Sequence, residues 1–262
     1  MALRLHPPTV LKILFFIALL ILPIVFLNIP PCFSQAAKSA SQNLAICHEL
    51  ARNRTDIAVY HEAINCYEQS FAAAPREDTA VRLGKGYYWL GAHSAEDVQT
   101  ELFQKGIDWS KKAIELNPKG AGGHFWLGVN NGKYGESRGI LKSLFLVGPI
   151  KDEMQQVIAI DSAYEHGGAY RVLGRMFYKL PGFAGGGLDK SITNLKKSLE
   201  YAPNVSTTHI FLAESYIKQK DYQSAKNELN FVLQAAVIPG LEPEFQADKA
   251  TAAKLLEELK DK

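Results

Sequence analysis

The chain has 262 residues, of which 47% are hydrophobic and 21% charged, and a formal net charge of +2. This composition excludes disordered and collagen-like proteins, and a nucleic-acid-binding protein would carry a larger basic excess. Three cysteines are too few for a disulfide-framework protein, whereas the length allows one large domain or two small ones with a sizeable core.

Residues 1–36 are predicted to be a secretory signal peptide. The start is basic, with Arg4 and Lys12. An unbroken apolar run follows at residues 13–27, and residues 34–36 have the small-residue pattern of a cleavage site. The apolar run is shorter than the ~20 residues that a membrane-spanning helix needs. We therefore expect cleavage after Ala36 and a periplasmic protein. The alternative is a membrane-anchored protein, through an uncleaved leader or through lipidation of Cys32.

Residues 37–262 are predicted to form a single domain of helical repeats. Segments that end at Pro75, Pro118 and Pro203 match the tetratricopeptide pattern, a helical hairpin of about 34 residues. In that pattern, small residues let the two helices approach closely and large residues fill the space between them. Five matches in register predict an all-α fold, a tetratricopeptide-like superhelix (α-solenoid).

The predicted hairpins cover residues 44–75, 77–118, 121–162, 167–203 and 206–237. An amphipathic segment at 244–261 is expected to be the C-terminal capping helix. The three central hairpins are longer than the pattern, which predicts long insertions between their paired helices. These insertions should gather on one rim, where repeat proteins often bind partners. The insertion at 139–148 is apolar, and we expect it to pack into the superhelix.

The first hairpin holds two cysteines, Cys47 and Cys66, at positions that can come close in an antiparallel pair. A disulfide bond and two buried free thiols are both open interpretations. The spacing of histidines and cysteines matches no zinc pattern, so no metal site is predicted. We expect no cofactor and no enzymatic activity, because no nucleophile–base motif is present. The glycine-rich stretch 182–187 lacks the lysine of a phosphate-binding loop and is expected to form an irregular loop.

Three stretches resemble the T component associated with TRAP transporters. They are residues 122–128 (GGHFWLG), the end of the apolar insertion at 144–147, and residues 170–175 followed by 179–182. The resemblance covers about residues 44–235. It implies a bacterial periplasmic or lipid-anchored α-superhelix with a central, largely apolar pore. It further implies docking onto the substrate-binding protein of an organic-acid transporter.

The concave wall of such a superhelix is lined mainly by residues of each first helix. The predicted binding residues there are aromatic, aliphatic or cationic: Lys85, Tyr88, Trp89, Phe125, Val129, Lys133, Arg171, Arg175 and Tyr178. Arg171 and Arg175 lie one helical turn apart, a spacing that suits a shared carboxylate. A small amphipathic organic acid would therefore fit the pore. The equally open alternative is a solvated face whose cations are balanced by acids elsewhere.

Two functions follow from these observations. The first is a periplasmic scaffold that docks with a TRAP substrate-binding protein and holds an organic acid in its pore. The alternative is a general protein–protein interaction module of the cell envelope with no small-molecule site. Nucleic-acid partners are not expected, and the formation of a homo-oligomer is left open.

Overall fold

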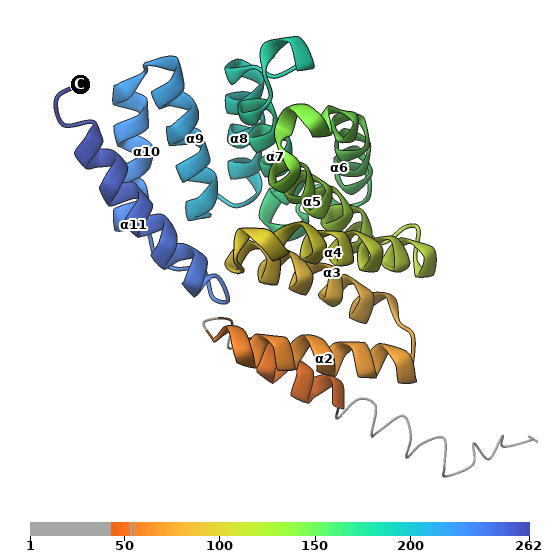
Figure 1. Ribbon diagram of the computed structural model, residues 1–262. Helices are drawn as coiled ribbons and strands as arrows, with labels where there is room; N and C mark the ends of the chain where they lie inside the picture. Colours follow the sequence, from red (N-terminus) through yellow and green to blue (C-terminus); the bar gives the residue numbers. More distant parts are fainter. Residues whose placement is uncertain (1–42, 53, 55) are drawn as a thin grey trace, which may run out of the picture.

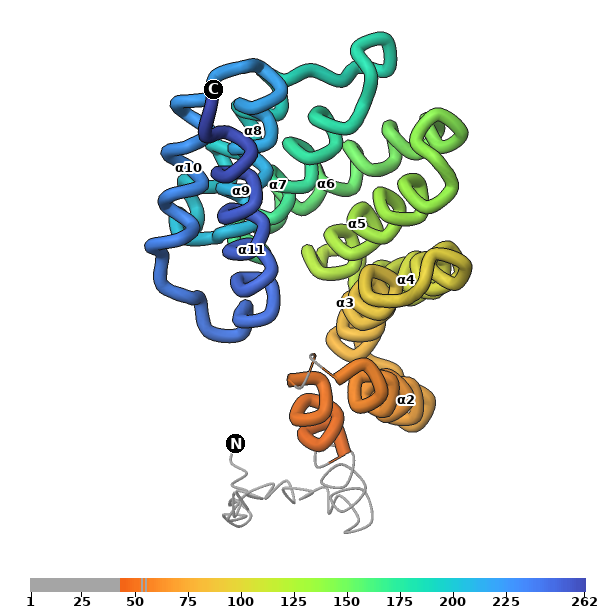
Figure 2. The backbone as a smooth tube through the Cα atoms, turned by 60° about the vertical axis from the view of Figure 1, so that its left-hand side comes forward, coloured from red at the N-terminus to blue at the C-terminus, as the bar shows by residue number. Residues whose placement is uncertain are grey.

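The computed structural model describes residues 43–52, 54 and 56–262 (Figure 1). The predicted signal peptide and its cleavage site lie outside the described residues. Within these residues the secondary structure is helical, with no strand. Antiparallel helices stack side by side into a curved superhelix (Figures 1 and 2). The predicted fold class, an all-α tetratricopeptide-like solenoid, is confirmed.

The helices of the described residues form five consecutive pairs and one final helix. The pairs are residues 43–52 with α2 (Ile57–Ala73), α3 (Glu77–His93) with α4 (Glu96–Leu116), α5 (Ala121–Arg138) with α6 (Val147–Asp161), α7 (Tyr164–Lys179) with α8 (Leu188–Tyr201), and α9 (Ser206–Gln219) with α10 (Tyr222–Gln234). The final helix, α11 (Glu242–Glu258), packs against α9 and α10. Two 3-10 helices, η1 (Ile140–Leu146) and η2 (Gly182–Ala184), lie inside the third and fourth pairs.

Small residues set the distance between paired helices. A Cβ atom at Gly174 of α7 would lie only 2.6 Å from Cγ of Leu195 in α8, which is itself fully buried. Since real Cβ atoms do not approach other atoms so closely, only glycine allows this spacing without movement of α8. The sequence pattern of small residues therefore has a direct steric cause.

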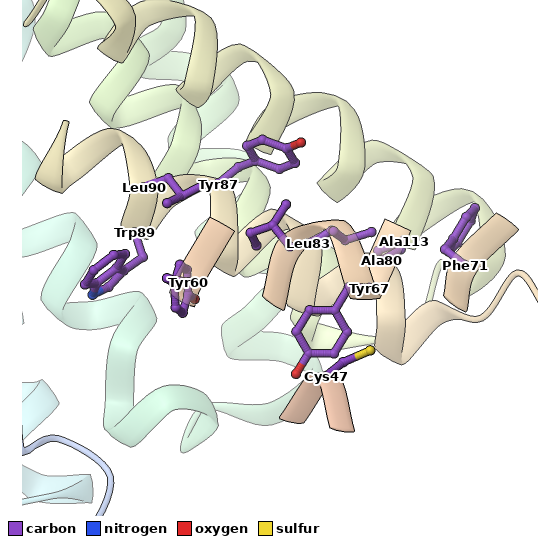
Figure 3. Close-up of a cluster of buried hydrophobic side chains, with 11 residues drawn as sticks. Cys47, Tyr60, Tyr67, Phe71, Ala80, Leu83, Tyr87, Trp89, Leu90 and Ala113 are labelled. Carbon is purple, nitrogen blue, oxygen red and sulfur yellow. The ribbon is translucent and has the colours of Figure 1, made fainter. Parts of the chain in front are cut away.

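The hydrophobic core runs along the stack in three clusters. One joins the first two pairs, and Figure 3 shows its aromatic side chains, among them Tyr60, Tyr67 and Tyr87. The second joins α5, α6 and α7, and the third joins α8 to α11. Each pair therefore buries its apolar face against its neighbours, as expected for a repeat protein.

The extra residues of the central pairs are accommodated in two ways. In the second pair they lengthen the helices, because only Ser94 and Ala95 separate α3 from α4. In the third and fourth pairs they form true insertions that contain η1 and η2. The expected packing of residues 139–148 holds for one side of η1 only: Ser143 is buried, whereas Leu141 and Phe145 are 68% and 69% exposed. A 3-10 helix has about three residues per turn, so one side of η1 faces the protein and the other faces solvent.

The two ends of the superhelix meet. Nη2 of Arg54 donates hydrogen bonds to the carbonyl oxygen of Gly240 (2.6 Å) and to Oε2 of Glu244 (2.9 Å). Figure 2 shows the first helices approaching the start of α11. We call this contact the seam; it links residues that are 186 and 190 positions apart. No helix in the described residues is long and apolar enough to span a membrane.

Candidate functional site

A cavity of about 330 Å³, the inner cavity, opens between α3, α5, η1, α6, α7 and α9. Most of its wall is aromatic or aliphatic, including Tyr88, Phe125, Trp126, Val129, Ile140, Leu146, Ile150, Val172, Met176 and Phe211. Its charged lining residues are Lys133, Glu136, Glu165, Arg171, Arg175 and Lys179. An apolar cavity with a few charged groups is the usual form of a small-molecule site.

The structure brings together six of the nine predicted binding residues. Tyr88, Phe125, Val129, Lys133, Arg171 and Arg175 all line the inner cavity. They come from the first helices of three consecutive pairs, α3, α5 and α7, as the concave-wall argument requires. The expected cluster of aromatic and cationic residues on that wall is therefore present for these six positions.

Trp89 does not line the inner cavity. It is buried against Tyr60, with ring centroids 4.4 Å apart, and stacks on His93 at 4.1 Å. Figure 3 shows Trp89 beside Tyr60. Consecutive residues of an α-helix point about 100° apart, so Tyr88 faces the cavity while Trp89 faces the first pair.

Lys85 and Tyr178 also lie outside the lining of the inner cavity. Lys85 is at its border, where Nζ pairs with Oε1 of Glu165 at 2.9 Å. Tyr178 packs between two cations, with Cζ of Arg175 at 4.9 Å and Nζ of Lys218 at 4.5 Å from its ring centroid. It therefore supports Arg175 rather than the cavity wall.

Several lining residues are not predicted from the sequence because they lie in an insertion. Ile140, Ser143 and Leu146 of η1 form part of the wall. Their spacing of three residues is the signal that could have found them, since it is the period of a 3-10 helix. An insertion that is expected to be a loop has no expected period, so its inward-facing residues cannot be selected by spacing.

The two arginines do not form a free guanidinium pair. The Arg175 guanidinium forms an ion pair with Glu214 of α9 and lies over the ring of Phe211, with Cζ 4.3 Å from the centroid. Both charged side chains are about three-quarters buried. Arg175 thus joins neighbouring pairs of the superhelix, and the expectation of one carboxylate shared with Arg171 is corrected here.

Arg171 has a different environment. Its Nη2 and Nη1 atoms donate to the carbonyl oxygens of Glu165 (3.1 Å) and His166 (3.3 Å). Burial lowers the pKa of the Arg171 guanidinium, and the charge of Glu165 opposes this shift. Among the described residues of the cavity wall, Arg171 is the cation with no carboxylate within ion-pair distance; the lysines there pair with Glu136. A bound anion would complete its coordination.

The backbone that Arg171 holds is strained. Glu165, His166 and Gly167 have φ values of 46°, 61° and 68°, a short left-handed turn at the start of α7. Left-handed φ is unfavourable for residues with a side chain and costs on the order of 1–3 kcal/mol each. A Cβ at Gly167 would also lie 2.8 Å from the carbonyl oxygen of Ser198. Strained backbone of this kind is often found at binding sites.

Two buried polar atoms of the cavity wall have no hydrogen-bond partner in the described part of the chain. They are Nε1 of Trp126 and Oγ of Ser143. A buried polar atom without a partner costs about 1–3 kcal/mol. The side chains that carry these two atoms both line the inner cavity.

The first helix pair is covalently closed by a disulfide between Cys47 and Cys66, with Sγ atoms 2.06 Å and Cα atoms 5.4 Å apart. Of the two interpretations of these cysteines, the structure has the disulfide. In the described residues, no group of three or more histidine, cysteine or acidic side chains is arranged to hold a metal ion.

The fold and the inner cavity define a tetratricopeptide-like helical-repeat scaffold. The chain belongs to the TRAP transporter T-component family, whose sequence profile matches residues 65–262. No curated protein sequence matches the chain.

Solved structures show the same architecture. TTC0263, a thermophilic TPR protein of Thermus thermophilus, superposes with a TM-score of 0.58 at 16% identity, covering 82% of this chain and 98% of its own. The pilF protein of Pseudomonas aeruginosa superposes with a TM-score of 0.54 at 12% identity, covering 86% and 94%. At these identities the likeness concerns the fold alone.

Proposed function

We propose that this chain is the periplasmic scaffold of a TRAP transport system. It docks with a substrate-binding protein and holds a small amphipathic organic acid in the inner cavity. Membership of the T-component family supports the assignment to such a system. The observation that carries the ligand part is Arg171, a half-buried guanidinium on an otherwise largely apolar wall with only carbonyl partners.

The chemistry of the wall specifies the ligand class. The carboxylate of the ligand binds Arg171, because a guanidinium forms its strongest hydrogen bonds with carboxylates. The aliphatic or aromatic body of the ligand lies along Phe125, Val129 and Met176. A second oxygen, such as a hydroxyl or keto group, satisfies Nε1 of Trp126 or Oγ of Ser143.

The insertions supply a surface for the partner. Three large apolar side chains project from η1 and η2: Leu141, Phe145 and Phe183 are 68%, 69% and 80% exposed. Residues of η1 and the end of α7, which leads into η2, also line the inner cavity. A partner that covers this apolar rim therefore also covers the cavity, which would allow a ligand to pass between the two proteins.

Octanoate tests the ligand part, with octanol as the uncharged control. We expect octanoate to raise the melting temperature in a concentration-dependent way, and octanol to have little effect. Arg171→Gln should weaken octanoate binding about tenfold or more, because a charge-assisted hydrogen bond is lost. Arg138→Gln is the matched control, since Arg138 is exposed and bonds only Tyr134 in the described chain. Equal affinity of both variants and the wild type would contradict the proposal.

Binding to the cognate TRAP substrate-binding protein tests the docking part. We expect the double substitution Phe145→Ser and Phe183→Ser to weaken binding at least tenfold in calorimetry. Leu116→Ser is the control, because Leu116 is an exposed apolar residue of α4 outside the insertions. Unchanged binding of the double variant would exclude this rim as the docking surface.

The alternative, an envelope interaction module without a small-molecule site, is favoured by the ion pairs in the cavity. Lys133, Lys179 and Arg175 already have carboxylate partners. Under this alternative, the partner binds the apolar rim as above, but no organic acid changes the melting temperature. The octanoate experiment therefore separates the two functions.

A further inference from the structure

A second cavity, of about 620 Å³, lies at the seam between the two ends of the superhelix. We call it the seam cavity. Its walls come from the helix at 43–52, from α2 and α3, and from the connection between α10 and α11. In Figure 2 these segments face one another across the lower part of the superhelix. The cavity is separate from the inner cavity, with which it shares no lining residue.

The wall of the seam cavity is rich in basic side chains. His48 and Arg52 are one turn apart on the first helix, and Arg82 and Lys85 are one turn apart on α3. Residues at these spacings lie on one face of a helix, so two basic pairs line the same space. Arg54 adds a fifth basic group, whereas Glu242 is the one acidic residue among the described lining residues.

The cations differ in how well they are neutralised. Arg54 and Lys85 have carboxylate partners at 2.9 Å, Glu244 and Glu165. Arg52 pairs with Glu49, but both side chains are more than 70% exposed, and such pairs contribute little.

Arg82 has no carboxylate within ion-pair distance in the described part of the chain, although it lines the cavity. Glu242, the acidic lining residue, accepts a hydrogen bond from the backbone N–H of Gly240 at 3.0 Å and forms no ion pair with Arg82. The positive charge of Arg82 is therefore available to a ligand.

The environment of His48 is consistent with a positively charged cavity. Burial lowers the pKa of His48, and the charges of Arg82 and Arg52 lower it further, against the opposing effect of Asp78. The Nδ1 atom of His48 lies 2.6 Å from the hydroxyl of Tyr67, which also lines the cavity. An anion between the two helices would offset the like charges of Arg82 and Arg52 and would accept hydrogen bonds from their guanidinium groups.

We propose that the seam cavity binds a compact oxyanion of the phosphate class, held by Arg82 with Arg52 and His48 on the facing helix. The phosphate is either free inorganic phosphate or the phosphate of a lipid headgroup, and both present the same oxygens to a guanidinium fork. Because the site lies at the seam, the bound anion also links the two ends of the superhelix. This site is independent of the organic-acid site.

Calorimetry with inorganic phosphate, at constant ionic strength set with sodium chloride, tests the free-phosphate source. We expect saturable binding and a rise in melting temperature with phosphate concentration. Arg82→Gln should weaken binding about tenfold or more. Arg76→Gln is the matched control, because Arg76 lies next to the start of the same helix and pairs with Asp78 on the surface. Arg171→Gln should bind phosphate like the wild type, because Arg171 lies in the other cavity. A negative result with organic acids therefore does not affect the result of this experiment.

Sedimentation with phosphatidylglycerol vesicles, compared with phosphatidylcholine vesicles, tests the lipid source. Binding to phosphatidylglycerol that Arg82→Gln abolishes and Arg76→Gln retains assigns the site to a headgroup. Binding of inorganic phosphate with the same dependence on Arg82 assigns it to the free ion. If the wild type binds neither probe, or if both variants lose binding equally, the proposal is wrong. Circular dichroism of Arg82→Gln verifies that the variant is folded.

Discussion

At the scale of single residues, two of the helix pairs are each held together by a histidine side chain. The Nε2 atom of His209 donates to the carbonyl oxygen of Pro203 at 2.8 Å, and Nδ1 lies 2.6 Å from Oε2 of Glu228. His124 of the third pair makes the same two kinds of contact, with a proline carbonyl at 3.0 Å and a glutamate at 2.6 Å. One ring thereby ties the start of a first helix to the preceding turn and to its partner helix.

The disulfide occupies the corresponding place in the first pair. Cys66 follows Cys47 by 19 residues, and Glu228 follows His209 by the same number. Among the described residues the first pair is the end of the stack, and it has a neighbouring pair on one side only. A covalent bond there compensates for the missing contacts, whereas a polar contact suffices inside the stack.

Replacement of His209 by alanine should lower the free energy of unfolding by about 1–3 kcal/mol. The substitution removes two hydrogen bonds of the buried His209 ring and leaves the carbonyl of Pro203 and the half-buried carboxylate of Glu228 without that partner. Urea unfolding measures the change. His61→Ala is the control, because His61 is exposed on α2. A His209→Ala variant as stable as His61→Ala would show that these hydrogen bonds contribute nothing.

Reduction of the disulfide should destabilise the first helix pair. Closing a loop of 19 residues contributes about 3 kcal/mol through the entropy of the unfolded chain. Dithiothreitol should therefore lower the melting temperature of the wild type. The double variant Cys47→Ser, Cys66→Ser should melt at the lower temperature whether or not dithiothreitol is present. A wild type that does not respond to the reductant would contradict this role.

At the scale of helices, the close spacing of α7 and α8 depends on the absence of a side chain at Gly174. Replacement of Gly174 by leucine should lower the free energy of unfolding by about 1–3 kcal/mol, since the new atoms overlap with Leu195. Gly148→Leu is the matched control: Gly148 is also helical, but a Cβ there meets no atom within 4 Å. Thermal unfolding compares the two, and equal melting temperatures would argue against the close contact.

The insertions show how much of the secondary structure can be predicted from the local sequence. The excess length of the central hairpins is visible in the sequence, but its form is not. In the second pair the extra residues continue the helical period through α4, which has 21 residues. In the third pair Gly139, with φ of 93°, ends α5 and starts η1. A positive φ of this kind favours glycine, and it marks the point where helix gives way to insertion.

At the scale of the whole molecule, the seam closes the superhelix. The Arg54 side chain is only 13% exposed, and it donates two hydrogen bonds to the C-terminal part of the chain. Replacement of Arg54 by alanine should speed hydrogen exchange at the start of α11 about tenfold or more, because a charge-assisted contact is lost. Arg76→Ala, which breaks an exposed pair, should leave this exchange unchanged. Unaltered exchange in Arg54→Ala would mean that the ends hold together without the seam.

The sequence by itself determined the all-α solenoid, the family and most of the concave wall. Every hairpin requires small residues at a fixed spacing, so the fold can be predicted from local sequence. The first helix of each hairpin faces inward, so most of the wall can be predicted as well. Six of the nine predicted wall residues, Arg171 among them, line the inner cavity. Only the tertiary structure decided which cations are free. Arg175 meets Glu214 across 39 residues, and Lys85 meets Glu165 across 80. Such pairs form only where the curvature of the whole stack brings distant residues together. That curvature is the total of small rotations between successive repeats, so it cannot be predicted from any short stretch of sequence.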